Sequence, residues 1–404
     1  MNLIKNIILV AGLTVVIPQS SFAGINFYKF PVPPEVEEQV NFWHRIFTKY
    51  TSKQSVVHDV DKPSIILDVI DFDLLAERFN EGEKYNKHER QRIRKKYIER
   101  YKLAISRFQN EGKKAISYGP MEERVLNVYS KQKHGLNHLF NRRINLRTQL
   151  GLSDEFERAA ERAEKYLPYM EDIFRHHLVP VDLTRLAFVE SMFNESALSK
   201  VGASGIWQFM PSTARRYIKV NGYIDERNSP IKATHAAAKY LRSNYEMLKS
   251  WPLAITGYNH GPSGMRRASK RLGTKNLGTI IKKYKNRTFG FASKNFYAEF
   301  LAANIVYKTK YKAPFKNRNP LQISKLKLSH PISIDQLTKK TPLNSDIIKK
   351  YNRCLNRTLF SRNKHKPLPE GYEIIVPQHI AQRIKKSIKK VASNSSSRRK
   401  RVRL

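Results

Sequence analysis

The apolar residues of the first third of the chain, residues 24–150, recur mainly at helical spacing. One helix is predicted over 36–48 and a second over 87–109. Their apolar stripes consist of Val36, Val40, Trp43 and Phe47 in the first, and Ile93, Tyr97, Tyr101, Ala104, Ile105 and Phe108 in the second. Arg and Lys fill the opposite face of the second helix, and such a face is usually just solvated. Residues 24–150 are therefore predicted to form a helical scaffold without a catalytic pattern.

From about position 152 the pattern changes to apolar helices joined by Gly, Ser and Pro. The capping and breaking signals are Ser153-Asp154, Pro180, Asp182 and Ser229-Pro230. No alternating strand pattern of any length occurs here. Residues 151–311 are predicted to form a compact all-helical domain.

The last part of the chain, residues 312–404, is strongly basic, with 24 Lys and Arg against four acidic residues. A basic linker and a small α+β module are expected over 312–380. The elements expected in this module are helical turns over 334–337 and 347–351 and a strand within 368–377. Residues 381–404 have no core-forming pattern and are predicted to be a basic disordered tail.

The N-terminal residues match the three parts of a secretory signal peptide. Lys5 precedes an apolar run over 7–17, and small residues at 21–23 precede Gly24. About eleven apolar residues are too few to cross a bilayer, which needs about twenty. We therefore expect a signal peptide over 1–23 and export to the periplasm or cell envelope, with an N-terminal anchor or a buried strand as the alternative. No cysteine follows the run, which excludes lipid attachment there, and no later segment could cross a membrane.

Composition narrows the classes of protein. The 404 residues carry a formal net charge of +41, with 40% hydrophobic and 11% aromatic residues. Such a chain can build real cores, so wholesale disorder is excluded, and its charge favours an anionic partner. The single cysteine excludes a disulfide framework within the chain and any Cys-based zinc site. A nucleic-acid binder would explain the charge, but the export signal and the absence of a recognised nucleic-acid motif argue against it.

One carboxylate stands out in the segment DLTRLAFVESMFNES, which starts at Asp182. In a continuous helix, Glu190 would share its stripe with Leu183, Leu186, Ala187 and Phe193. Burial raises the pKa of a carboxyl group, which would let it keep a proton near neutral pH and act as a general acid. A structural Glu that pairs with a buried Arg or caps a neighbouring loop fits the stripe equally well.

The following segments favour a catalytic role of Glu190 over a structural one. Residues 199–211 place glycines and small residues before Trp207 and Gln208, and glycines let the backbone approach a ligand closely. Residues 257–261, GYNHG, place aromatic and amide groups at the end of another helix. Such groups suit sugar rings, which have apolar faces and hydroxyl edges.

Three segments, VESMFNESALSKVGASGIWQFMPSTA, GYNHG and FASKNFYAEFLAA, occur in this order. Together they resemble the soluble lytic transglycosylase (SLT) domain family, in particular its membrane-bound lytic murein transglycosylase D branch. The resemblance covers residues 152–311. It implies a lysozyme-like helical domain that needs no cofactor and cleaves the bond between N-acetylmuramic acid and N-acetylglucosamine in peptidoglycan, leaving a 1,6-anhydro ring. The expected fold class is mainly α, with an N-terminal helical extension and a small α+β C-terminal module.

The resemblance also assigns residues. Glu190 is implied as the catalytic acid/base. The implied substrate-binding residues are Ser191, Gly202, Gly205, Gln208, Met210, Tyr258, Asn259 and Tyr297. One position departs from the family, which has Tyr after the Asn of its last motif, whereas Asn295 is followed by Phe296. If that hydroxyl orients the acid, Tyr297 acts from a shifted position or the role is lost.

A single carboxylate suits a substrate-assisted reaction. Glu190 would protonate the leaving oxygen, the N-acetyl oxygen of the substrate would stabilise C1, and the ionised Glu190 would then take the proton of the C6 hydroxyl. Glu195 and Asp225 are candidates for a second carboxylate, but their polar contexts predict capping or pairing. A lysozyme-type hydrolase and a non-catalytic peptidoglycan-binding envelope protein remain as alternatives.

Two further expectations concern ligands. His177, His235 and His260 lack any metal-site spacing, so no metal is expected. The segments IDQLTKKTPLNSDIIKKYN and LPEGYEIIVP are weakly similar to the LysM peptidoglycan-binding repeat, and a plain linker is the alternative. The expected partners are peptidoglycan glycan strands and, through the basic C-terminal region, anionic envelope polymers.

Overall fold

A computed structural model describes residues 29–311 and 320–389 of the 404-residue chain. The predicted signal peptide over 1–23 and the last part of the predicted tail, 390–404, lie outside the described residues. So do residues 312–319, at the start of the segment predicted as linker and α+β module.

The chain divides into two compact units. The described part of the first unit comprises residues 29–160 and 243–311, and that of the second comprises 161–242 and 320–389. Each unit is therefore assembled from two separate stretches of sequence.

The first unit begins with helix α1 (Pro34–Thr48) and a three-stranded antiparallel sheet. The strands are β1 (Gln54–Asp59), β2 (Ile66–Asp71) and β3 (Leu146–Leu150), in the order β2-β1-β3. In this sheet Val57 pairs with Asp68 on one side and Thr148 on the other. The helix predicted over 36–48 is confirmed. The region is mainly helical as predicted. Its three strands were not located from the sequence, because such short segments pair with partners distant in sequence, which their own patterns do not reveal.

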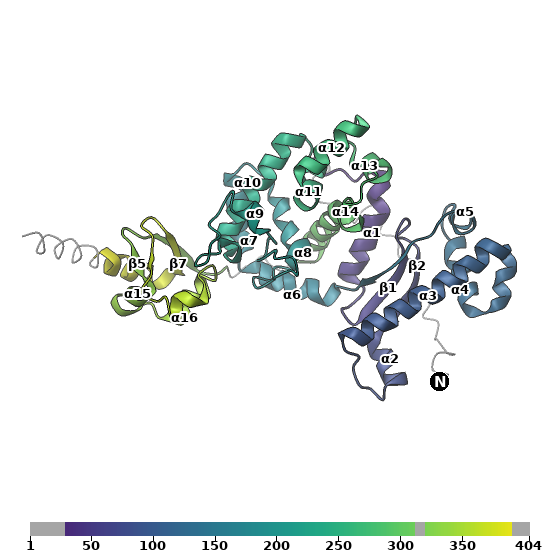
Figure 1. Ribbon diagram of the computed structural model, residues 1–404, viewed down its shortest axis with the longest axis horizontal. Coiled ribbons are helices and arrows are strands. Elements are labelled where there is room, and N and C mark those ends of the chain that lie inside the picture. The colour runs from purple at the N-terminus through teal and green to yellow at the C-terminus, as the bar shows by residue number, and fades with distance from the viewer. Residues whose placement is uncertain (1–28, 312–319, 390–404) are drawn as a thin grey trace, which may run out of the picture. The chain divides into compact units, whose positions relative to one another are not determined.

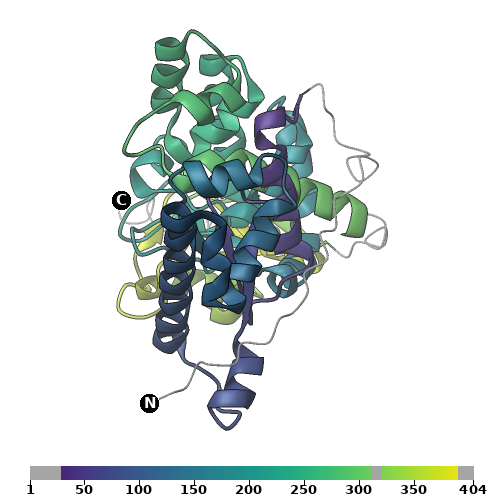
Figure 2. The ribbon, with the colours of Figure 1, turned by 90° about the vertical axis from the view of Figure 1, so that its right-hand side faces the viewer.

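Four helices accompany the sheet (Figures 1 and 2). They are α2 (Phe72–Phe79), α3 (Lys87–Glu111), α4 (Pro120–Ser130) and α5 (Gly135–Asn141). Helix α3 confirms the second predicted helix and starts with a capping box in which the Asn86 side chain accepts from the Glu89 amide. Its apolar stripe is buried against the sheet, with Tyr101 and Phe108 in the same core as Leu67.

The second stretch of the first unit is helical. It contains α11 (Trp251–His260), α12 (Pro262–Leu272), α13 (Leu277–Lys283) and α14 (Phe291–Val306). Helix α14 is buried along most of its length and packs against α1. The Trp43 indole on α1 donates a 3.0 Å hydrogen bond to Oδ1 of Asn295 on α14. Residues distant in sequence are thus joined in one core.

The second unit starts with helices that lead to the candidate catalytic residue. They are α7 (Leu167–His176), the 3-10 turn Val181–Arg185, α8 (Leu186–Ser191), α9 (Pro211–Ala214) and the 3-10 turn Glu226–Asn228. The residues of α6 (Ser153–Glu164) and α10 (Pro230–Leu248) are divided between the two units. Within the described part of 151–311, β-structure is limited to isolated bridges, so the all-helical prediction for this segment is confirmed.

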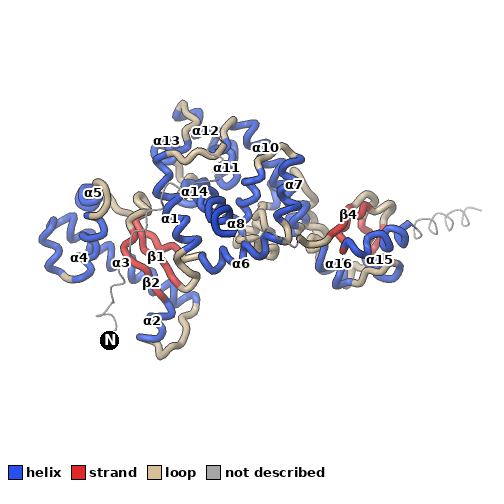
Figure 3. The backbone as a smooth tube through the Cα atoms, turned by 180° about the vertical axis from the view of Figure 1, so that it is seen from behind, coloured by secondary structure: helices blue, strands red, loops and turns tan. Residues whose placement is uncertain are grey.

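The C-terminal part of the second unit is an α+β module with two small antiparallel sheets (Figure 3). Strand β4 (Ile323–Lys327) pairs with β7 (Glu373–Pro377), and β5 (Ile332–Ser333) pairs with β6 (Pro367–Leu368). Helices α15 (Ile334–Lys340) and α16 (Ser345–Tyr351) lie where helical turns were predicted. The predicted α+β character and the predicted strand are confirmed.

The start of the predicted disordered tail is ordered. Residues 381–389 are helical, and Ala381, Ile384 and Ile388 are buried in the core of the module. Their spacing of three and four residues is that of a helix face, which the high charge of the segment concealed. Disorder was therefore the wrong prediction for 381–389.

Helices able to span a membrane are not found in the described parts of the chain, because none combines sufficient length with sufficient apolarity. Cys354 is a buried free thiol whose Sγ lies 3.5 Å from the hydroxyl of Tyr372.

Candidate active site

Glu190 lies in the last turn of α8, which is shorter than the sequence suggested. The predicted continuous helix is replaced by a 3-10 turn over Val181–Arg185, followed by a six-residue α-helix. The helix ends because Met192 and Phe193 take left-handed φ values of 50° and 54°. The amide of Phe193 then donates a 3.1 Å hydrogen bond to the Ala187 carbonyl, which closes the end of the helix.

The apolar stripe around Glu190 is buried as predicted. Leu183, Leu186, Ala187 and Phe193 have no measurable exposure. Glu190 itself is half-buried. Phe193 reaches this core through the helix ending rather than by helical spacing. The result is a carboxyl group set at the edge of a rigid apolar core.

The end of α8 is held by side chains on both sides. The Ser191 hydroxyl donates a 2.9 Å hydrogen bond to the carbonyl of Ile206 in the following loop. The Arg162 guanidinium donates through Nε and Nη2 to the carbonyl of Met192, at 3.1 and 2.8 Å. The Ser191 hydroxyl is thus engaged with the backbone of the loop. Glu190 therefore lies on a segment whose next two residues are held in place, Ser191 through its side chain and Met192 through its carbonyl.

Gln208 braces the loop over 197–209. Its side-chain Nε2 donates to the carbonyls of Ala197 and Gly205, at 3.2 and 2.9 Å. The amide of Gly205 donates to the same Ala197 carbonyl at 2.9 Å. The amide nitrogen that the sequence assigned to substrate binding is therefore used inside the loop.

The two loop glycines differ in their surroundings. Gly202 has φ 88° and open space where a side chain would lie, whereas Gly205 has φ 76° and lies against the backbone of Arg227. The Arg227 guanidinium donates to the carbonyls of Gly202 and Phe209, at 2.7 and 3.0 Å. Only a residue without a Cβ lets the backbone at Gly205 approach Arg227 this closely.

An aromatic anchor joins the loop to its surroundings. Trp207 is fully buried, stacks on Phe174 of α7 with 5.6 Å between ring centroids, and donates to the Thr234 hydroxyl at 2.9 Å. Met210, at the end of the loop, remains 39% exposed. The loop is therefore rigid at its base and presents an apolar side chain to solvent.

The remaining predicted residues belong to the first unit. Tyr258 and Asn259 lie in the last turn of α11, where Tyr258 is half-buried and Asn259 is exposed. The Tyr258 ring is nearly parallel to that of Phe296 on α14, with 6.4 Å between centroids. The Ser293 hydroxyl donates to Oδ1 of Asn259 at 2.9 Å. The GYNHG and FASKNFY segments are thus brought together, as side chains of α11 and α14.

Tyr297 does not line a site. It is fully buried, and its hydroxyl donates a 2.7 Å hydrogen bond to the carbonyl of Pro31. Burial raises the pKa of this phenol. The assignment of Tyr297 to substrate binding is therefore corrected. One residue of displacement along a helix turns a side chain by about 100°, which here places Tyr297 in the core.

The candidates for a second carboxylate are paired. Asp225 caps the 3-10 turn Glu226–Asn228 and forms a two-pronged ion pair with Arg227, at 2.9 and 2.6 Å. Glu195 lies 3.7 Å from the Arg353 guanidinium. Both carboxylates serve as structural partners, as their polar contexts indicated.

Two of the histidines considered for a metal contact each other. Nε2 of His177 lies 3.1 Å from Nδ1 of His235. Burial, reinforced by Lys325, lowers the pKa of His235 to about 4. In the parts of the chain that the structure describes, no group of three or more His, Cys, Asp or Glu side chains is arranged to hold a metal ion.

Sequence reasoning missed Glu299 on α14. Burial raises the pKa of this carboxyl group to about 8, so it holds a proton at neutral pH. Its position four residues after Asn295, in a helix that is otherwise almost wholly apolar, was a signal that could have identified it.

Comparisons with known proteins identify the family. A model of the transglycosylase SLT domain matches residues 172–288. Membrane-bound lytic murein transglycosylase D of Escherichia coli K12 is 33% identical over 111 residues, which are 27% of this chain and 25% of that protein. A putative tributyltin chloride resistance protein of Alteromonas sp. M-1 is 30% identical over 149 residues, covering 31% of this chain and 72% of that protein.

The match to transglycosylase D thus spans a quarter of the length of that relative. The crystal structure of the 70 kDa soluble lytic transglycosylase from Escherichia coli is 16% identical, over 47% of this chain and 33% of that one, with a TM-score of 0.30. That score is too low to carry an argument about the fold. The family match and the helical content confirm the predicted mainly α class and the resemblance read from the motifs. The chain belongs to the transglycosylase SLT domain family.

Proposed function

We propose that the protein is a lytic transglycosylase that cleaves the β-1,4 bond between N-acetylmuramic acid and N-acetylglucosamine in peptidoglycan and leaves 1,6-anhydro ends. The observation that carries the proposal is the placement of Glu190, a half-buried carboxyl group at the end of a helix whose next two residues are held from both sides. The lytic transglycosylases among the similar proteins support the same substrate.

The proposed chemistry uses Glu190 twice. As an acid it protonates the glycosidic oxygen, and the C1–O bond breaks as the substrate's own N-acetyl oxygen bonds to C1. As a base it then takes the proton of the C6 hydroxyl, whose oxygen attacks C1 and displaces the N-acetyl oxygen. This step closes the anhydro ring, returns the proton to Glu190 and consumes no water.

The loop over 197–209 is proposed to line the sugar subsite next to Glu190. In this proposal Gly202, Gly205 and Gln208 shape the backbone, and the exposed Met210 offers an apolar contact to a sugar face. Ser191 acts as a positioning residue through the Ile206 carbonyl. On the first unit, Tyr258 and Asn259 are proposed as sugar-contacting residues because both reach the surface.

The basic C-terminal module is proposed to bind the envelope polymer rather than to cleave it. Asn352 is buried and bonds to both the amide and the carbonyl of Ile375 on β7, at 2.8 Å each. This clamp makes the module rigid enough to present its Lys and Arg side chains to anionic groups, and salt would weaken the contact. We further propose that the protein is exported to the cell envelope.

The test is the digestion of purified sacculi by wild-type protein and by the variants Glu190→Gln and Glu195→Gln. Glu190→Gln is expected to lower the rate of release of anhydro products at least about 100-fold, because general acid–base catalysis contributes that much or more. Glu195→Gln is the matched control, since this carboxylate pairs with Arg353. Circular dichroism checks that both variants fold.

Mass spectrometry decides the reaction type. Anhydro ends are one water lighter than the reducing ends that a hydrolase makes. Reducing ends alone would show a lysozyme-type hydrolase, and undigested sacculi would show a binding protein. Near-normal cleavage by Glu190→Gln would reject the assignment of the acid.

A further inference from the structure

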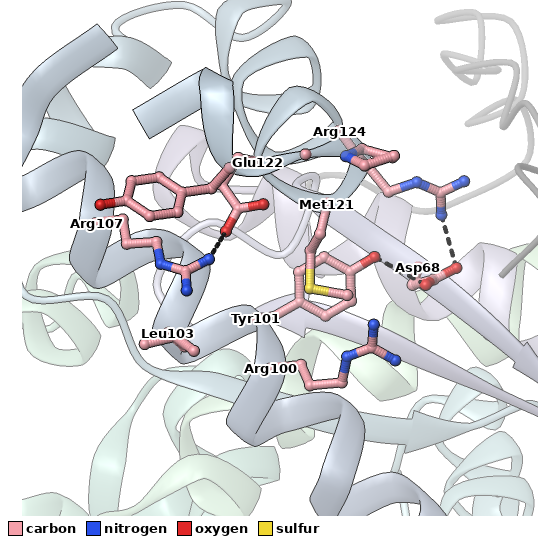
Figure 4. A pocket seen from close by; sticks show the side chains of 11 residues that line it. Asp68, Arg100, Tyr101, Leu103, Arg107, Met121, Glu122 and Arg124 are labelled. Atoms are coloured by element: carbon pink, nitrogen blue, oxygen red, sulfur yellow. Dashed lines mark hydrogen bonds and ion pairs between the residues drawn. The ribbon is translucent and has the colours of Figure 1, made fainter. Parts of the chain in front are cut away.

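The first unit contains a pocket of about 270 Å³ that is lined by none of the candidate active-site residues. Helix α3 lines one side and the start of α4 the other, with Asp68 of β2 at one edge (Figure 4). Its charged residues are Asp68, Arg100, Arg107, Glu122 and Arg124.

Two of the three arginines have a carboxylate partner within the pocket. Arg124 donates to Asp68 at 2.7 Å, and Arg107 donates to Glu122 at 2.6 Å. The hydroxyl of Tyr101 also donates to Asp68, at 2.8 Å. These bonds fix the walls of the pocket and neutralise two of its positive charges.

Arg100 differs from its neighbours. Its Nη1 is buried and has no hydrogen-bond partner among the described residues, and Figure 4 draws no bond from it to the other pocket residues. The pocket therefore carries an excess of one positive charge. Burying a guanidinium nitrogen without a partner costs free energy. The Arg100 guanidinium also supplies the excess positive charge of the pocket, which attracts an anionic ligand.

The rim of the pocket is apolar. Leu103 and Tyr118 line it, and each is 53% exposed. The Arg107 guanidinium lies 4.2 Å from the centroid of the Tyr118 ring, so the aromatic wall is held in place. The pocket thus offers one unpaired cation beside apolar surface.

We propose that this pocket binds the terminal carboxylate of a short peptide, and that the source is the peptide stem of peptidoglycan. A carboxylate matches the single excess charge and the forked geometry of a guanidinium, whereas a phosphate dianion would bring a second charge. The apolar rim suits the methyl group of a terminal alanine. The choice of the stem as the source rests on the proposed function, but the carboxylate chemistry does not.

Calorimetric titration of the full-length protein tests the proposal. The probe is a synthetic stem pentapeptide ending in D-alanine, either as the free acid or as the C-terminal amide. Arg100→Gln is compared with Arg92→Gln, a matched change at an exposed position of the same helix. We expect wild type to bind the amide at least about tenfold more weakly than the acid. We also expect Arg100→Gln to bind the acid at least about tenfold more weakly than wild type does. Arg92→Gln should bind like wild type.

Equal binding of acid and amide, or equal affinities of the two variants, would overturn the proposal. So would the absence of saturable binding of the acid up to about 10 mM. A free-acid peptide of unrelated sequence that binds as tightly as the stem peptide would overturn the stem as the source. None of these titrations depends on glycan cleavage, so loss of the proposed function and loss of the pocket's function are measured separately.

Discussion

Replacement of Gly205 by alanine is the sharpest test of how the loop over 197–209 positions Glu190. An added Cβ would lie 2.9 Å from the carbonyl carbon of Arg227 and closer still to its oxygen, where ordinary contacts begin at 3.4 Å. Both atoms belong to the backbone, so they cannot rotate away. Either the loop or the turn at Arg227 must therefore move.

The loss of stability in Gly205→Ala can be estimated by comparison with Gly202→Ala, a change in the same loop. At both positions the positive φ penalises alanine by about 1–2 kcal/mol. Only Gly205 adds the steric conflict, which is worth about 1–3 kcal/mol by analogy with overpacked cores. Gly205→Ala is therefore expected to lose about 1–3 kcal/mol more free energy of unfolding than Gly202→Ala.

Gly205→Ala should affect the cleavage rate more strongly than it affects the free energy of unfolding. The carbonyl of Ile206, next to Gly205, accepts the hydrogen bond of Ser191, which adjoins Glu190. A displacement of about 1 Å in a catalytic group can cost about 100-fold in rate. We therefore expect Gly205→Ala to lower cleavage of sacculi at least about tenfold, and Gly202→Ala to leave it within about threefold of wild type.

The assay is urea denaturation followed by tryptophan fluorescence, to which the nearby Trp207 contributes, together with the rate of sacculus digestion. Equal losses of stability in the two variants would refute the steric argument. A normal digestion rate in Gly205→Ala, despite its lower stability, would refute the link from the loop to Glu190.

Two further predictions concern α14. Tyr297→Phe should lower the free energy of unfolding by about 1 kcal/mol, because it removes the hydrogen bond to the Pro31 carbonyl. It should leave the cleavage rate unchanged. A tenfold loss of cleavage would show that Tyr297 does act in the active site. The pKa of Glu299 is raised from 4.5 to about 8, so between these values the folded protein holds a proton that the unfolded chain has lost. Stability should therefore fall as pH rises through this window, by at most about 5 kcal/mol, and Glu299→Gln should flatten the dependence. Urea midpoints of wild type and Glu299→Gln at several pH values measure this dependence. Parallel profiles for the two proteins would contradict the shifted pKa of Glu299.

Much of the helical architecture could be read from spacing. The stripe of α3 and the capping signal at Asn86 both lie within one continuous segment, and both appear in the structure. The short strands β1 and β2 could not be read in this way, because a strand is stabilised by partners elsewhere in the chain. The helix over 381–389 was missed because its charged residues outnumber the buried ones, Ala381, Ile384 and Ile388.

In the candidate site, too, some features are visible in the sequence and others arise only on folding. Glu190 could be singled out because an ionisable group on an apolar stripe is costly wherever it lies, and that cost is visible in the sequence. The roles of its neighbours could not be read, because they depend on atoms brought together by folding. Ser191 bonds to the carbonyl of Ile206, and Gln208 bonds back to Ala197.

The amino-acid sequence by itself determined the helical periods, the basic C-terminal region and the motifs that place the chain in its family, since each is a property of neighbouring residues. Only the tertiary structure decided that Tyr297 is a core residue bonded to Pro31, that Gly205 must lack a side chain because of Arg227, and that Arg100 has an unpaired nitrogen in a pocket. Hydrogen bonds and steric contacts act over a few ångströms. Which residues come within that range is set by the packing of segments that lie far apart in the sequence.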